Sequence, residues 1–139
     1  MLKATGIVVS FVIGIVLVLV VILSIDSDSQ QTSGDKLSQE DVEKGLDLQK
    51  NGGDGTYIVN LTSGKFEGKT KGQVLSDTNC APDEDNISRC HNDIALADSN
   101  KEITVINPHN MQKNRCLTPG ETVQISRNED DKVAIELME

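Results

Sequence analysis

The sequence contains no tryptophan, and aromatic residues make up only 2% of its 139 positions. Outside an apolar run near the N-terminus, Tyr57 and Phe66 are the only aromatic side chains. Proteins that bind single-stranded nucleic acid stack bases on aromatic rings, so this mode of recognition is excluded. Positive charge is also scarce, because 13 basic residues stand against 22 acidic ones and the formal net charge is -9. Phosphate backbones repel such a chain, and we expect no nucleic-acid partner.

Charged residues are absent from residues 4–25, which read ATGIVVSFVIGIVLVLVVILSI. As a helix, this segment would span roughly 33 Å, which matches the core of a lipid bilayer. Cleavable signal peptides usually have a shorter apolar core and a small-residue cleavage site, and neither feature is present here. We therefore predict an uncleaved transmembrane anchor over residues 1–25. Lys3 precedes the span and Asp26 and Asp28 follow it, which predicts a cytoplasmic N-terminus and a single pass through the cell membrane, with the C-terminal domain outside.

Small residues recur at intervals of four along the predicted anchor. Gly6, Ser10 and Gly14 would share one face of a helix and would let a second transmembrane helix approach closely. Such residues are also common in helices that face only lipid. The pattern leaves two alternatives, which are packing against a partner helix and ordinary exposure to the bilayer.

A polar linker with one short helix is predicted over residues 26–55. It begins with the small, polar, aperiodic segment DSDSQQTSG, which is typical of a flexible spacer. Ser38 can cap a helix, with Asp41 as a weaker capping-box partner and Leu37 placed to pack on Val42. The segment Asn51-Gly52-Gly53 supplies the predicted stop.

The remaining residues, 56–139, alternate between apolar and polar side chains with the period of a β-strand. Tight turns are predicted at Pro119-Gly120 and at residues 128–131. Short strands, each with one apolar face, predict a mainly β domain, as a small antiparallel barrel of five or six strands (OB-like or SH3-like) or a sandwich. The candidate strands are residues 56–61, 65–70, 72–77, 92–97, 102–107, 122–127 and 132–137, of which 65–70 is a possible short edge strand.

Three cysteines, Cys80, Cys90 and Cys116, are the only ones in the chain. An oxidising exterior favours one disulfide and one spare thiol, and three cysteines allow three pairings. Cys90 shares strand parity with Ile94 and Leu96, so we expect its side chain to face the core. The sequence does not select a pair.

A soft-metal site is the alternative interpretation of the same region. No cofactor is expected in the main interpretation, but thiolate, thioether and imidazole ligands together suit copper. His109 and Met111 are two residues apart, so an extended backbone would project both to one side, with Cys116 within reach after a turn. Cys90 and His91 are further candidates, although neighbours on a strand point to opposite faces.

The segment CLTPGETVQI, which begins at Cys116, resembles the Pro-Gly turn and following strand of cupredoxins over ten residues. Cupredoxins place their ligands in the order Cys, His, Met, whereas His109 and Met111 here precede the cysteine. A third interpretation makes Cys116 a nucleophile with His109 as its base, as in extracytoplasmic transpeptidases. The flanking NRCLTPG lacks the glycine-cysteine-isoleucine-arginine signature of the L,D-transpeptidases. No complete catalytic motif is present, and we do not expect an enzyme.

Two asparagines, Asn60 and Asn86, satisfy the N-x-S/T glycosylation pattern. Asn86 lies in a polar segment, whereas Asn60 falls inside a predicted strand. Taken together, the sequence predicts a membrane-anchored extracytoplasmic module that contacts the lipid bilayer and binds or supports another membrane or envelope protein. A copper-binding or redox accessory protein is the alternative.

Overall fold

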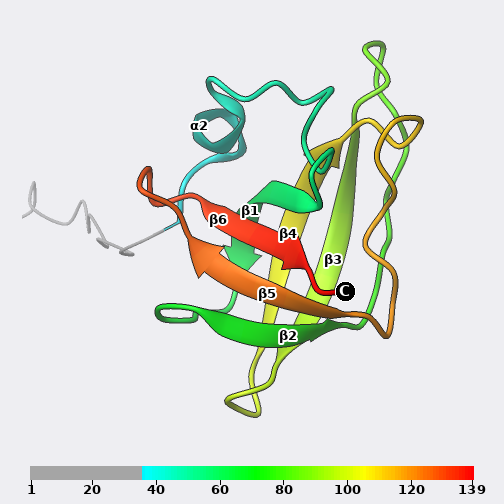
Figure 1. Cartoon of the computed structure of the whole chain (residues 1–139). Coiled ribbons are helices and arrows are strands. Elements are labelled where there is room, and N and C mark those ends of the chain that lie inside the picture. The colour runs from blue at the N-terminus through cyan, green and yellow to red at the C-terminus, as the bar shows by residue number, and fades with distance from the viewer. Residues whose placement is uncertain (1–35) are drawn as a thin grey trace, which may run out of the picture. The chain divides into compact units, whose positions relative to one another are not determined.

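A six-stranded antiparallel barrel forms the body of the computed structural model, which describes residues 36–139. Neighbouring strands are hydrogen-bonded in the closed order β1-β4-β3-β2-β5-β6 (Figure 1). Strands β2, β3 and β4 follow one another as a meander, and β1 pairs with β4, which gives a Greek-key arrangement. The strands are β1 (Thr56–Ser63), β2 (Thr70–Val74), β3 (Ser88–Leu96), β4 (Glu102–His109), β5 (Thr122–Arg127) and β6 (Val133–Leu137).

The β5–β6 hairpin closes the barrel, because β5 pairs with β2 and β6 pairs with β1. Alternate side chains of every strand point inward, and these fill the interior. The core members share an exposed fraction of 9% or less. They are Tyr57, Val59, Leu61, Phe66, Val74, Ile94, Leu96, Ile103, Val105, Leu117, Val123, Ile125, Val133 and Ile135.

The predicted mainly β fold and small antiparallel barrel are confirmed, and the sandwich alternative does not apply because the sheet closes on itself. The finer description as OB-like or SH3-like stays a prediction. The strand predicted over residues 65–70 is wrong, since residues 65–69 form a loop and Thr70 begins β2. That segment has a single apolar side chain, Phe66, which is buried in the core with the Arg127 guanidinium 5.3 Å from its ring centroid.

The short helix α2 (Gln39–Glu43) begins where the capping pattern predicted. Ser38 Oγ accepts a hydrogen bond from the backbone N–H of Asp41 at 3.1 Å. The predicted stop at residues 51–53 is wrong, because the helix ends at Glu43, with Lys44 as its C-cap, and Gly45 follows with φ of 78°. Glycine adopts this left-handed backbone without the penalty that a Cβ atom brings, so the chain turns away there.

The predicted anchor over residues 1–25, with the Gly6, Ser10 and Gly14 face, lies outside the described residues. So does the first part of the linker. Within residues 36–139, no helix has both the length and the apolar character that a membrane crossing requires.

Candidate functional site

One end of the barrel is lined by polar side chains instead of aliphatic ones. Ser88, Cys90 and Asn92 are inward-facing residues of β3, and Asn107 and His109 are inward-facing residues of β4. All five are fully buried. Ser88 pairs with His109 and Cys90 pairs with Asn107 in the antiparallel register, so these side chains face the same space. The barrel therefore has a mainly aliphatic core and a polar end.

A disulfide between Cys80 and Cys90 lies at this end, with a Cα–Cα distance of 4.4 Å. The predicted disulfide is thus confirmed, and the structure selects one of the three pairings. Cys80 belongs to the loop that follows β2. Backbone hydrogen bonds also hold this loop against β3. Thr78 donates its N–H to the carbonyl of His91 at 2.9 Å, and His91 donates to the carbonyl of Thr78 at 2.7 Å.

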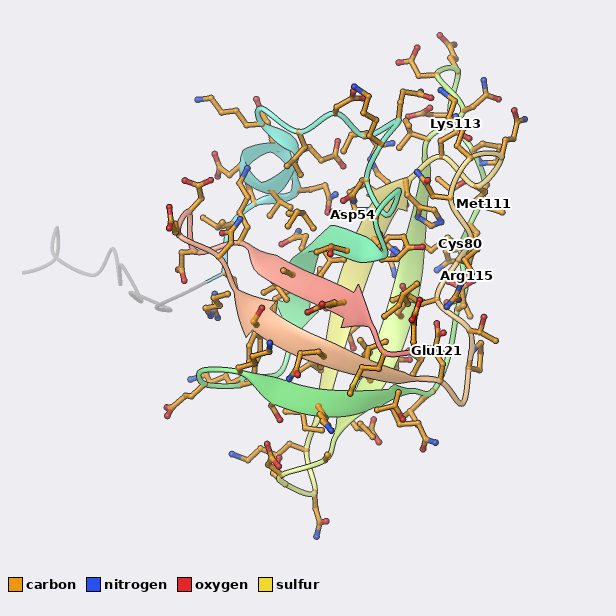
Figure 2. The ribbon with its side chains drawn as sticks, viewed as in Figure 1. Asp54, Cys80, Met111, Lys113, Arg115 and Glu121 are labelled. Carbon is orange, nitrogen blue, oxygen red and sulfur yellow. A yellow bond between two sulfur atoms is a disulfide. The ribbon has the colours of Figure 1, made fainter. Side chains whose placement is uncertain are left out.

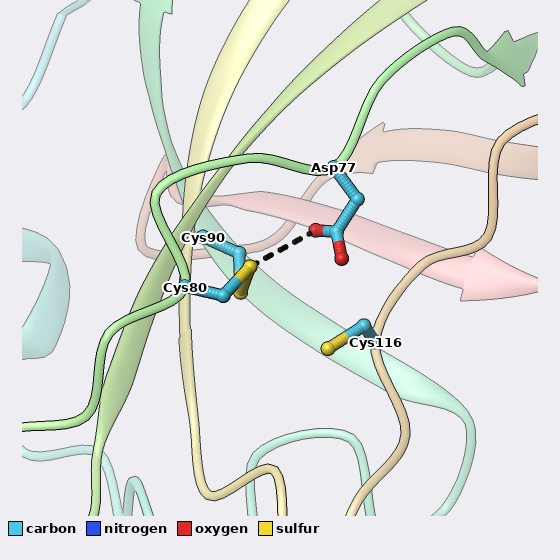
Figure 3. Close-up of side chains that lie close together, drawn as sticks. All are labelled: Asp77, Cys80, Cys90 and Cys116. Carbon is cyan, nitrogen blue, oxygen red and sulfur yellow. Dashed lines mark hydrogen bonds between the residues drawn. A yellow bond between two sulfur atoms is a disulfide. The ribbon is translucent and has the colours of Figure 1, made fainter.

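The third cysteine, Cys116, and the carboxylate of Asp77 lie beside the disulfide (Figure 3). One ligand atom from each of Asp77, Cys80, Cys90 and Cys116 lies within 4.8 Å of each of the other three. We call these four residues the sulfur–carboxylate cluster. Asp77 Oδ1 accepts a hydrogen bond from Asn92 Nδ2 at 2.8 Å, and the sulfur of Cys80 lies 3.5 Å from the same oxygen.

Burial raises the pKa of the Cys116 thiol to about 11, and the negative charge of Asp77 adds to this effect. At neutral pH the thiol is protonated. The thiolate is the nucleophilic form of cysteine, so this environment disfavours the interpretation of Cys116 as a catalytic nucleophile.

His109 is enclosed in the barrel and stacks edge-on against Tyr57, with ring centroids 5.6 Å apart. Its Nδ1 atom lies 3.2 Å from the backbone carbonyl oxygen of Asn107. Burial lowers the pKa of His109, and the imidazole is neutral at pH 7. Within the described part of the chain, its Nε2 atom has no hydrogen-bond partner.

The loop after β4 carries one further predicted ligand, Met111, outward. Met111 is 42% exposed, and it lies with Lys113 on the outer side of this loop (Figure 2). The loop is braced by the ion pair between Arg115 and Glu121, whose Nη2 and Oε2 atoms are 2.7 Å apart. Tyr57 donates its hydroxyl to the carbonyl of Arg115 at 2.6 Å, which fixes the chain next to Cys116.

Of the five predicted metal ligands, the structure gathers only Cys90 and Cys116 into the sulfur–carboxylate cluster. The expectation that His109 and Met111 project to one side is wrong, because β4 ends at His109, which is buried, and Met111 follows in an exposed turn. His91 alternates with Cys90 and is half-buried on the other face of β3. Asp77 was not a candidate, since nothing in the sequence distinguishes it from the other acidic residues.

The two glycosylation candidates differ sharply in exposure. Asn60 is 6% exposed in β1, and its Nδ2 atom donates to Gln39 Oε1 at 3.0 Å. Asn86 is exposed in the loop between Asp83 and Ile87. Of these two asparagines, only Asn86 presents its side-chain amide to solvent.

Comparison of the chain with models of protein families, with curated proteins and with solved structures finds no match in any of the three.

Proposed function

We propose that the chain is a single-pass membrane protein whose barrel lies outside the cell and acts as an accessory module. In this role it binds or supports another envelope protein or membrane complex. The uncharged run over residues 4–25 supports the anchor, and the flanking charges Lys3, Asp26 and Asp28 support the orientation.

The observation that carries the extracytoplasmic assignment is the Cys80–Cys90 disulfide. Disulfides form and persist in oxidising environments outside the cytoplasm and are rare in the cytosol, and small secreted domains use them to supplement a limited core. A barrel of six short strands is such a domain.

A binding role is supported by the rigid attachment of the segment that precedes β1. Arg89 on β3 holds Glu43 through two hydrogen bonds, from Nε to Oε1 at 2.8 Å and from Nη2 to Oε2 at 2.9 Å. Asn51 bridges the carbonyls of Ile58 and Pro108 with its Nδ2 atom, at 2.9 Å and 2.7 Å. These contacts fix residues 36–55 on the barrel, so the loops of the barrel form a firm surface for a partner.

The proposal is tested by purifying the full-length chain from its own membranes in mild detergent after chemical crosslinking. Stoichiometric recovery of another membrane or envelope protein is the expected result, whereas a monomer without any retained partner contradicts the accessory role. If the small-residue face forms the contact, replacing Gly6, Ser10 and Gly14 by leucine removes the partner. The matched changes Val8→Leu and Val12→Leu, on the opposite helix face, retain it.

A second candidate function is an extracytoplasmic copper-binding or redox accessory protein. The specific observation in its favour is that Cys90 and Cys116, two of the predicted ligands, lie close together, because sulfur ligands suit soft metals. This candidate predicts that the chain isolated from copper-supplemented cells contains one copper ion per chain. If the chain contains no copper after isolation under oxidising conditions and also after isolation under reducing conditions, copper binding is contradicted.

A further inference from the structure

The sulfur–carboxylate cluster has the dimensions of a metal site. Its four ligand atoms lie within 4.8 Å of one another and come from three separate segments of the chain. In a tetrahedral zinc site with Zn–S bonds of 2.3 Å and a Zn–O bond near 2.0 Å, the ligand atoms are about 3.5–3.8 Å apart. Shifts on the order of 1 Å, within the reach of side-chain rotation, separate one arrangement from the other.

We propose that reduction of the Cys80–Cys90 disulfide converts this cluster into a zinc site. The thiolates of Cys80, Cys90 and Cys116 and the carboxylate of Asp77 then bind one Zn²⁺ ion. The oxidised chain lacks the site, because the two sulfurs of the disulfide are bonded to each other and only Cys116 and Asp77 remain.

A dithiol reductant supplies the electrons for this conversion. The dithiol transfers two electrons and two protons to the disulfide, the bond between the Cys80 and Cys90 sulfurs breaks, and the reductant becomes a disulfide. Zinc binding then displaces one proton from each of the three thiols to solvent. The site is thus controlled by redox state and belongs to a protein that meets both oxidising and reducing partners.

The scaffold around the cluster does not depend on the disulfide. The backbone pairing of Thr78 with His91 keeps Cys80 next to Cys90 after reduction. On the other side, the hydrogen bond from Tyr57 to the carbonyl of Arg115 keeps Cys116 in place. The ligands are therefore held in position by neighbouring elements, which reduces the entropy cost of assembling the site.

Unpartnered buried polar atoms next to the cluster independently favour the thiolate form of its cysteines. The side-chain amide of Asn107 lies opposite Cys90 in the β3–β4 register, and both its Nδ2 and Oδ1 atoms lack partners among the described residues. A buried N–H group without an acceptor costs free energy, and a neighbouring thiolate would supply that acceptor. Asn92, two residues from Cys90 on β3, already orients Asp77 by a 2.8 Å hydrogen bond.

The ligand set favours zinc over copper. Zn²⁺ accepts thiolate sulfur and carboxylate oxygen in the same tetrahedral site, whereas Cu⁺ prefers sulfur alone. The cluster contains a carboxylate as its fourth member and neither histidine. Zinc therefore uses all four groups.

The test is a zinc titration of the full-length chain in detergent, against a chromophoric chelator, after reduction by a phosphine or after oxidation. The reduced chain is expected to bind one Zn²⁺ and the oxidised chain none. Cobalt(II) gives a second readout, because bonds from thiolate sulfur produce a charge-transfer band that a nonspecific carboxylate site lacks. Cys116→Ser leaves the disulfide intact and is expected to weaken zinc binding by at least about 100-fold, since even groups that only support a ligand contribute about 10- to 100-fold.

Two conservative variants complete the experiment. Asp77→Asn removes the charge but not the shape, and is expected to weaken zinc binding by about 10-fold or more while the cobalt charge-transfer band remains. Asp85→Asn, in an exposed loop, is the control and leaves zinc affinity unchanged. The proposal is overturned if the reduced chain binds no stoichiometric zinc, if Cys116→Ser binds as tightly as the parent, or if the reduced chain takes up copper but not zinc. A cooperative unfolding transition in the Tyr57 fluorescence of each variant shows that the barrel is folded.

Discussion

Replacing Asn51 by alanine tests how residues 36–55 are joined to the barrel. Asn51 is 8% exposed, and its side chain makes three hydrogen bonds to the backbone of two strands. Nδ2 donates to the carbonyls of Ile58 and Pro108, and Oδ1 accepts from the N–H of Ile58 at 2.8 Å. Alanine leaves these groups without partners in a nearly closed space. Each unsatisfied buried group costs about 1–3 kcal/mol of stability, and water that enters the space recovers part of this cost. We therefore expect the free energy of unfolding to fall by about 2–4 kcal/mol.

This loss corresponds to a fall in the melting temperature of about 10–20 °C for a domain of this size. The assay is thermal and urea unfolding of the oxidised full-length chain in detergent, followed by tyrosine fluorescence. Tyr57 is the only tyrosine, the chain has no tryptophan, and the ring is fully buried, so this signal reports on the barrel alone. Asn100→Ala, in an exposed turn, is the control and is expected to change stability by less than about 0.5 kcal/mol. Equal stability of the two variants would refute the bridging role of Asn51.

Three further changes probe other parts of the barrel. Gly52 has a backbone φ of 94°, and in Gly52→Ala the added Cβ atom would clash with the ring of Tyr57. We expect the free energy of unfolding to fall by about 2–4 kcal/mol and the Tyr57 fluorescence of the folded state to change. The Arg89 guanidinium lowers the pKa of Glu43, and Arg89→Gln removes this ion pair. Urea unfolding is expected to show a loss of stability of about 1 kcal/mol at pH 7. The loss disappears as the pH falls and Glu43 becomes protonated. Because the pKa of His109 is lowered in the folded chain, the unfolded chain binds this proton more readily. Stability therefore falls as the pH drops below about 6.5, by at most about 1.4 kcal/mol per pH unit. His109→Gln is expected to remove this pH dependence.

Strands with regular alternation could be predicted, because apolar residues on the inward face alternate with polar residues on the outward face. The strand predicted over residues 122–127 coincides with β5, and the turn at residues 128–131 joins it to β6 as expected. The closed order was not predictable, since pairing of β1 with β4 and of β2 with β5 joins distant segments. Local pattern carries no information on such contacts.

The polar end of the barrel explains why the candidate site was predicted only in part. The segment SRCHN at the start of β3 places serine, cysteine and asparagine on the inward face, so the apolar signal of a strand is missing and the predicted strand began at Asn92. The parity argument for Cys90 was confirmed by its burial. Asp77 could not be predicted as part of the site, because only the fold brings it near Asn92 and Cys116.

The most direct test of this account is the pairing of the three cysteines in the chain isolated under non-reducing conditions. Intact mass with thiol alkylation, followed by peptide mapping, is expected to show Cys80 joined to Cys90 and one alkylated thiol at Cys116. A disulfide that includes Cys116, or three free thiols without bound zinc in the chain as isolated from outside the membrane, would contradict it.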